Sequence, residues 1–422
     1  MTLEGPFVQA AIARLPEPET SLAAFGIVVS LSVTIEAPVI MLLATTTALC
    51  RNGTSYVVLR RFMIALNVIL TAVAAIVAFT PVYGLVVQGL MGVPAHIAEA
   101  AQPGMAILTF WSAAIGWRRF YQGVLIRFGQ TRRITLGTFV RLFASAGTAL
   151  MLTLWGRLPG VVVGSCALMV GVLAEATLVT WLVRPTVRTR LRDSRPAAVA
   201  AEEITPLTIR RVIGFHAPLA ATSLLTLFSQ PLISAGLARM AFPEQSLAAW
   251  PVANGLLLFA RSFGLATQEV VIALSDGPGT LRPLRRFAAN VAIGSILALA
   301  FIAFTPLVHI YLTDIAGVSS ELAGFIVPGV RAALLIPGLT TLQSWLRALL
   351  MKGEATTSIY QAMGINLLVT ALAVITGVIL NAPGIQMAAV ALTVAMLAEL
   401  VFLRQRAKRA VIVLQAGFPE PA

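Results

Sequence analysis

Residues 21–50 read SLAAFGIVVSLSVTIEAPVIMLLATTTALC, a run of 30 residues in which Glu36 is the only charged side chain. A helix that crosses the hydrocarbon layer of a membrane needs about 20 mostly apolar residues, so this stretch is long enough to span it. Its apolar positions lack the period of two that strands of a membrane barrel have. This segment therefore predicts a transmembrane helix.

The rest of the chain continues in the same way. Hydrophobic residues make up 58% of the 422 residues, charged residues make up 11%, and the mean hydropathy is +0.90. No soluble core requires such a composition, so we expect an all-α integral membrane protein and not a soluble enzyme. A short apolar stub at 6–15 precedes eleven expected spans. Besides 21–50, these spans are 62–83, 104–126, 134–156, 158–183, 212–240, 246–275, 287–309, 322–351, 355–380 and 383–403.

Basic residues are distributed unevenly between the two ends of these spans. On one side of the expected membrane, the loops hold 22 of the 30 basic residues, in 51–61, 127–133, 184–211, 282–286, 347–352 and 404–409. The loops on the other side carry only Arg14, Arg157 and Arg239. The positive-inside rule places this richer side, with the C-terminus, in the cytoplasm. We therefore interpret the net charge of +13 as a sign of the protein's orientation in a bacterial inner membrane. We expect no nucleic-acid partner.

An internal repeat with an offset of 225 residues relates the two halves of the chain. Ser21-Leu22-Ala23-Ala24-Phe25 matches Ser246-Leu247-Ala248-Ala249-Trp250, and Pro103–Gly104 matches Pro328–Gly329. Six spans per half is an even number, so the halves should share one orientation, as in parallel-repeat transporters. We expect an N-lobe at 1–184, a cytoplasmic linker at 185–207, a six-helix C-lobe at 208–404 and a cytoplasmic tail at 405–422.

The repeat also predicts that the first helix is truncated at its N-terminus. About twenty residues of helix precede Pro231 in the second half, but only five residues precede its counterpart Pro6. A stub of ten residues spans about 15 Å, half of the hydrocarbon thickness. We expect that the natural protein begins upstream of Met1.

Charged residues inside the spans are the candidates for ligand binding or gating, because a charge at the bilayer centre is costly unless it faces protein or water. These candidates are Glu36, Arg118, Arg119, Arg261 and Arg331, whereas Arg141, Glu269 and Glu399 are read as lying near span ends. The excess of arginine favours an anionic ligand, since guanidinium groups bind carboxylate and phosphate well. The alternative is that these charges only pair internally.

Glu36 and Arg261 stand at equivalent positions of the repeat, and we expect them to act as a gate or latch. Pro38, Pro231 and Pro337 lie within spans and are the candidate hinges, because a proline frees a backbone carbonyl and permits bending. Such prolines are also common in membrane helices that do not bend during function.

Other chemistry is weakly represented in the sequence. Gly277-Pro278-Gly279-Thr280 lacks the lysine of a phosphate-binding loop, and His96, His216 and His309 are too scattered to form a metal site. The spans show no nucleophile with a matching base. We therefore expect no enzyme activity, no metal and no cofactor.

Loose motifs give the chain a resemblance to the MATE-like exporters and flippases, and among them to the progressive ankylosis family. They are Leu22-Ala23-Ala24-Phe25-Gly26 with Ser30–Leu31, then Gln230-Pro231-Leu232-Ile233, then Pro328-Gly329-Val330-Arg331 with Pro337 and Leu346. The resemblance covers nearly the whole chain. It implies two six-helix lobes forming a V around a central cavity, and export by alternating access.

The substrate class that the resemblance implies is organic anions, such as citrate or nucleotide-type phosphates, with coupling to H⁺ or Na⁺, and we expect a monomer in the lipid bilayer. The three aspartates, Asp193, Asp276 and Asp314, all fall in loops, so the membrane-embedded aspartate of drug-exporting relatives is missing. A MATE-type cation or drug antiporter, a flippase for a lipid-linked precursor and a non-transporting membrane scaffold remain as alternatives.

Overall fold

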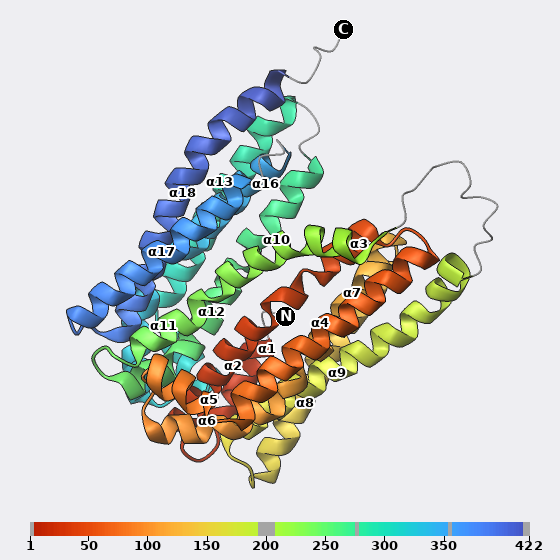
Figure 1. Ribbon diagram of the computed structural model, residues 1–422. Coiled ribbons are helices and arrows are strands. Elements are labelled where there is room, and N and C mark those ends of the chain that lie inside the picture. The colour runs from red at the N-terminus through yellow and green to blue at the C-terminus, as the bar shows by residue number, and fades with distance from the viewer. Residues whose placement is uncertain (1–3, 193–206, 275–277, 353–356, 417–422) are drawn as a thin grey trace, which may run out of the picture. The chain divides into compact units, whose positions relative to one another are not determined.

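The computed structural model describes residues 4–192, 207–274, 278–352 and 357–416, and every regular element in these ranges is a helix (Figure 1). The described residues divide into two compact units. The first unit comprises Leu15–Pro231, and the second comprises Leu232–Ala422 together with Thr2–Arg14. The all-α fold expected from the sequence is confirmed.

The first unit contains the helices that follow the short first helix, up to the middle of the chain. They are α2 (Pro18–Ile40), α3 (Leu42–Leu49), α4 (Gly53–Phe79), α5 (Val82–Gly84), η1 (Leu85–Leu90), α6 (Ala95–Ile107), η2 (Leu108–Phe110), α7 (Trp111–Arg127), α8 (Thr131–Trp155), α9 (Gly160–Thr186), η3 (Val187–Arg192) and α10 (Ile209–Leu227). Within this unit α8 packs along α9, while α2 packs against α6, α7 and α10.

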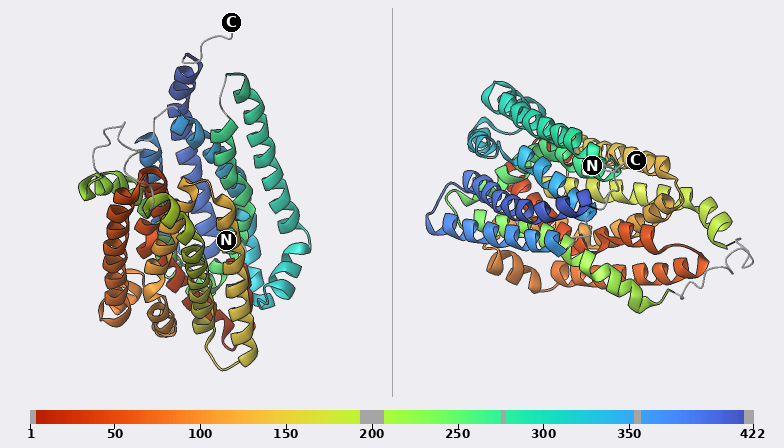
Figure 2. Two further views of the ribbon diagram at one scale, coloured as in Figure 1. Left: turned by 90° about the vertical axis from the view of Figure 1, so that its right-hand side faces the viewer. Right: turned by 90° about the horizontal axis from the view of Figure 1, so that it is seen from above.

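The second unit contains α1 (Glu4–Ile12) and the remaining helices. These are α11 (Ser229–Leu237), α12 (Pro243–Leu274), η5 (Pro278–Thr280), α13 (Leu281–Phe304), α14 (Leu307–His309), η6 (Ile310–Ile315), α15 (Ser320–Ala332), α16 (Ile336–Lys352), α17 (Thr357–Ile379) and α18 (Gly384–Ala416). The long helices α17 and α18 lie side by side, as the views of Figures 1 and 2 agree.

Nine helical segments in the described ranges are long and apolar enough to cross a membrane, and α15 with α16, bent by 42°, would give a tenth. They correspond to ten of the eleven expected spans. The exception is 104–126, which is divided between α6, the 3₁₀ turn η2 and α7. Arg118, Arg119 and Arg127 lower the apolarity of α7, which is nevertheless packed inside the first unit through Gly116 and Phe120.

The repeat explains why glycines occur at two matching positions. A Cβ atom added to Gly104 on α6 would lie 2.8 Å from Ser165 Oγ and 2.9 Å from Val161 Cγ2, both on α9. In the second unit, a Cβ added to Gly329 on α15 would clash with Ile385 on α18. Because only glycine permits such close packing, the matched Pro-Gly pairs bring equivalent helices together in the two units.

The short helix α1 packs with the second unit. Gln9 Nε2 donates a hydrogen bond of 3.0 Å to the carbonyl of Pro251 on α12, and Arg14 donates to the carbonyls of Asp314 (3.1 Å) and Ile315 (2.9 Å). Conversely, α10 packs with the first unit on α2, although it follows the linker. The sequence did not predict this exchange, and the lobe boundaries 1–184 and 208–404 stay a prediction.

Candidate functional site

A buried carboxylate, Glu175 on α9, organises the polar interior of the first unit. Its side chain is 0% exposed, and Arg118 Nη1 donates to its Oε2 at 2.6 Å. Gln122 Nε2 donates to the other oxygen, Oε1, at 2.9 Å. From α8, Arg141 Nη1 lies 3.8 Å from Oε2. Two residues four apart on α7 and one on α8 thus hold a single glutamate. We call Arg118, Gln122, Arg141 and Glu175 the first clamp.

The first clamp follows from the cost of burying charge. A buried ion whose partner is missing is strongly destabilising, so each oxygen of Glu175 requires a donor. Arg118 and Gln122 supply the donors from one face of α7, because residues four apart on a helix are neighbours. The guanidinium of Arg141 also lies over the ring of Trp111, 5.8 Å from its centroid.

Several polar atoms beside the first clamp are buried without a partner among the described residues. They are Glu36 Oε2, Trp111 Nε1, Arg118 Nε and Arg119 Nε. Glu36 is 7% exposed, whereas Arg119 is partly exposed. With the three arginines and two glutamates ionised, the cluster carries a net charge of +1. Three of these four atoms are N–H donors and one is an acceptor, so the cluster has more unused donors than acceptors.

The second unit holds its own clamp around Glu399 on α18, which is 1% exposed. Arg347 forms an ion pair with Oε1, and its Nε donates to the same oxygen at 3.1 Å. Gln343 Nε2 donates to Oε2 at 3.1 Å, and Asn366 Nδ2 donates to Oε2 at 2.9 Å. The second clamp therefore comprises two residues four apart on α16, one residue on α17 and the glutamate.

The two clamps are related by the internal repeat. Adding 225 to 118, 122 and 141 gives 343, 347 and 366, and adding 224 to 175 gives 399. The arginine and glutamine are interchanged between the halves, and Asn366 replaces Arg141. The residues at 118 and 343, 122 and 347, and 141 and 366 therefore differ, and a search for identical residues does not find the relation. The spacing of the residues could have revealed the relation between the clamps, because Arg-x₃-Gln in one half and Gln-x₃-Arg in the other both precede a span with a central glutamate.

The structure corrects two interpretations of charged residues. The sequence places Arg141 and Glu399 near span ends, where long side chains reach the interface. Instead both are buried in the clamps, with 8% and 1% exposed surface. Hydropathy cannot reveal this, because it does not show whether a charged side chain faces a partner on a neighbouring helix.

Arg261 on α12 belongs to the second unit. Its Nε donates to Thr340 Oγ1 on α16 at 2.8 Å, and the charged groups that act on it are Arg347 and Glu399. Glu36 lies in the first unit, where Arg118, Arg141 and Arg119 act on it. The gate between Glu36 and Arg261 stays a prediction.

Arg331 differs from the other candidates, because its side chain is exposed. Its Nε donates to the carbonyl of Ala303 at 3.1 Å, and its guanidinium lies 5.1 Å from the ring centroid of Phe304. Both partners are at the C-terminal end of α13. A role of Arg331 in ligand binding stays a prediction.

The three candidate hinge prolines lie close to breaks in helices. Pro38 precedes the break at Met41 between α2 and α3, and Pro231 lies just after the break between α10 and α11. Pro337 is the second residue of α16, beside the 42° bend. Their function as hinges stays a prediction.

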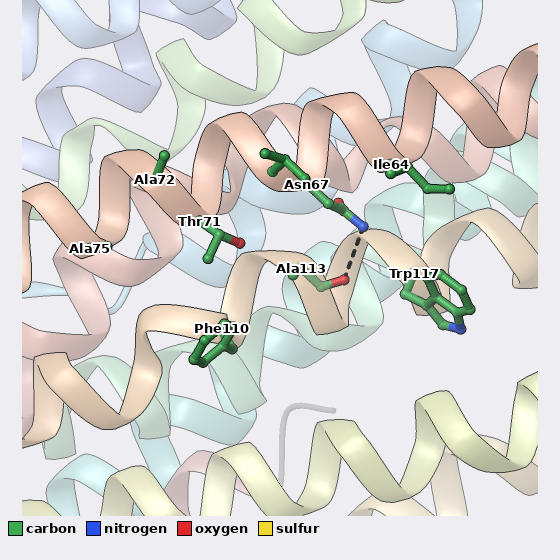
Figure 3. Close-up of a pocket in the computed structure, with 9 residues that line it drawn as sticks. Ile64, Asn67, Thr71, Ala72, Ala75, Phe110, Ala113 and Trp117 are labelled. Atoms are coloured by element: carbon green, nitrogen blue, oxygen red, sulfur yellow. Dashed lines mark hydrogen bonds between the residues drawn. The ribbon is translucent and has the colours of Figure 1, made fainter.

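An apolar groove of about 500 Å³ lies between α4 and α7 in the first unit (Figure 3). Asn67 Nδ2 crosses its base to donate to the carbonyl of Ala113 at 3.2 Å. The lining residues are Ile64, Asn67, Val68, Thr71, Ala72, Ala75, Phe110, Ala113 and Trp117. Ile64, Val68 and Phe110 are strongly exposed, so the groove opens on the surface of the unit.

The described part of the chain contains no group of three His, Cys, Asp or Glu residues that could hold a metal ion. Both cysteines are free thiols, with Cys50 buried and Cys166 partly buried. The chemistry of the interior therefore consists of hydrogen bonds and ion pairs among arginine, glutamate and amide side chains.

A scan with models of known families and a search of curated proteins found no match. Solved structures are similar over nearly the whole chain. An inward-facing multidrug resistance MATE family transporter of the MOP superfamily has 14% identity and a TM-score of 0.76, covering 99% of this chain and 96% of that chain. The lipid II flippase MurJ, in an inward closed conformation, has 12% identity and a TM-score of 0.77, covering 98% and 88%.

A MOP superfamily transporter from Pyrococcus furiosus, whose binding pocket is described as having reverse polarity, has 13% identity and a TM-score of 0.57, covering 97% and 95%. These likenesses show the fold: the chain is a multi-pass integral membrane protein with the fold shared by MATE transporters and the flippase MurJ. The particular resemblance to the progressive ankylosis family stays a prediction.

Proposed function

We propose that the chain is a secondary-active exporter that moves small organic anions, such as citrate or phosphate-containing compounds, outward by alternating access. It acts as a monomer in a bacterial inner membrane with a cytoplasmic C-terminus, coupled to H⁺ or Na⁺, and belongs with the progressive ankylosis family. The fold supports transport, because its structural neighbours are transporters and flippases.

One observation carries the choice of an anion. The polar interior of the first unit holds one more arginine than glutamate, with Arg118, Arg119 and Arg141 against Glu36 and Glu175, whereas the second unit has Arg261 and Arg347 with two buried glutamates, Glu4 and Glu399. An uncompensated cation in a membrane interior is costly. A carboxylate or phosphate ligand would neutralise it through charge-assisted hydrogen bonds, whereas a cationic drug would increase the repulsion.

Transport by purified protein in proteoliposomes tests this function. We expect efflux of labelled citrate or a labelled nucleotide, and a response to an imposed proton or sodium gradient or to a potassium diffusion potential. A cationic dye serves as the opposing probe. If the dye moves and no anion does, the protein is a cation antiporter, and if no solute moves, it is a scaffold or acts on lipids.

A flippase for a lipid-linked precursor is the second candidate, and the groove between α4 and α7 favours it. An apolar groove of about 500 Å³ on a membrane-spanning unit can hold part of an acyl or polyprenyl chain. The arginines would then bind a pyrophosphate headgroup. Translocation of a labelled polyprenyl pyrophosphate in the same vesicles, with no movement of citrate or nucleotide, would decide in favour of this function.

A further inference from the structure

The polar cluster of the first unit contains a carboxylate that the first clamp does not use. Glu36 Oε2 is buried and accepts no hydrogen bond from the described residues. Arg118, Arg141 and Arg119 are the cations that act on Glu36. Because Arg118 and Arg141 already hold Glu175, Arg119 is the cation left to balance Glu36.

Arg119 is suited to bind a ligand because its side chain is partly exposed, whereas Arg118 is buried. Its Nε has no acceptor, and Glu36 is the foremost opposite charge that acts on it. Trp111 Nε1 is a further buried donor, and Glu36 is the carboxylate on which it acts. Two donors, Arg119 Nε and Trp111 Nε1, beside one loosely held carboxylate form a site that can exchange an internal anion for an external one.

We propose that Glu36 is the internal counter-ion of Arg119, and that an anionic substrate takes its place while Glu36 binds a proton. This inference rests on the proposed function. Oxygen atoms of the substrate accept hydrogen bonds from Arg119, and the Glu36 carboxylate, now beside a second negative charge, accepts H⁺ from water on the side from which the anion entered. Release of the anion reverses both steps. One proton therefore travels in the same direction as each anion.

Other titratable groups around α2 do not replace Glu36 in this step. Glu175 on α9 is held by Arg118, Arg141 and Gln122. His216 on α10 faces the backbone of Pro38, two residues after Glu36, but its Nδ1 bonds to Thr45 Oγ1 at 2.9 Å. The remaining charged residues on α4, α6 and α10 that are described as exposed are Arg60, Arg61, His96, Glu99, Arg210 and Arg211.

Proton uptake on anion binding tests the inference with purified protein in weakly buffered detergent solution. Citrate or ATP is added, and the pH change and the bound anion are measured together. We expect about one proton to be taken up per anion in the wild type, so that affinity falls about tenfold per pH unit above neutrality. Glu36→Gln should bind the anion with no uptake beyond that of the anion itself and with a flat pH profile.

Glu99→Gln is the matched control, because it removes an exposed carboxylate from α6, a helix that also packs on α2. It should behave as the wild type, and size-exclusion profiles check that both variants are folded. Anion binding with equal proton uptake in wild type and Glu36→Gln would overturn the inference and leave the proposed function intact. Failure of the wild type to bind either anion would overturn both.

Discussion

At Glu175 and Glu399, a buried carboxylate is satisfied by an arginine and a glutamine four residues apart on the second long helix before it, α7 for Glu175 and α16 for Glu399. The two clamps use these residues in opposite order, Arg118 then Gln122 and Gln343 then Arg347. What the fold requires is therefore one cation and one amide at this spacing, and not a particular residue at each position. Both clamps leave the carboxylate without exposure to solvent.

The first prediction concerns this interchange. Arg118→Gln leaves Glu175 with Arg141 as its remaining cation and should destabilise the protein by about 3 kcal/mol, the cost of breaking a buried ion pair. The double variant Arg118→Gln with Gln122→Arg should recover more than half of that loss, because it copies the order of the second clamp. Thermal unfolding in detergent measures both values.

The reciprocal change in the second unit, Gln343→Arg with Arg347→Gln, is the matched control and should also be tolerated. A double variant no more stable than Arg118→Gln alone would show that the two clamps are not equivalent. It would also remove the main structural support for the internal repeat at these positions.

At the scale of helices, close approach of α6 to α9 depends on Gly104. Replacement by alanine should destabilise the protein by about 1–3 kcal/mol, because the added methyl group would press on Ser165 and Val161. Gly147 on α8 is the control, since an added Cβ there meets nothing within 4 Å. Gly147→Ala should be neutral or slightly stabilising. Thermal unfolding in detergent measures the stability of both variants. Equal destabilisation by Gly104→Ala and Gly147→Ala would refute the packing argument.

The sequence predicted most helices, because a long apolar run has one stable form in a membrane. The prediction from sequence failed for features that tertiary packing determines. The span 104–126 is broken at η2 and carries two arginines, Arg118 and Arg119, and hydropathy cannot tell whether such charges face lipid or protein. It could not predict that α1 packs on α12 or that α10 packs on α2, since neighbours in space need not be neighbours in the chain. It identified Glu36, Arg118 and Arg119 as charges inside spans but did not predict that Gln122 and Arg141 join Arg118 around Glu175.

At the scale of the whole molecule, the distribution of arginine predicts the orientation in the membrane. After removal of Cys50 and Cys166, a cysteine introduced at Thr131, at the start of α8, should react with an impermeant maleimide only from the cytoplasmic side. A cysteine introduced at Asp314 should react from outside intact cells. Both positions are exposed. Labelling of Thr131→Cys in intact cells would reverse the orientation.

The central claim is that arginines of the polar interior bind a transported anion, and counterflow of labelled citrate tests it most directly. Proteoliposomes loaded with unlabelled citrate should take up labelled citrate through the wild-type protein and the Glu99→Gln control. Arg119→Gln and Arg261→Gln should each lower this uptake at least tenfold, as loss of a charge-assisted hydrogen bond of about 1.5–3 kcal/mol requires. Undiminished citrate counterflow in both arginine variants, or counterflow of a cationic dye with none of citrate, would contradict the claim.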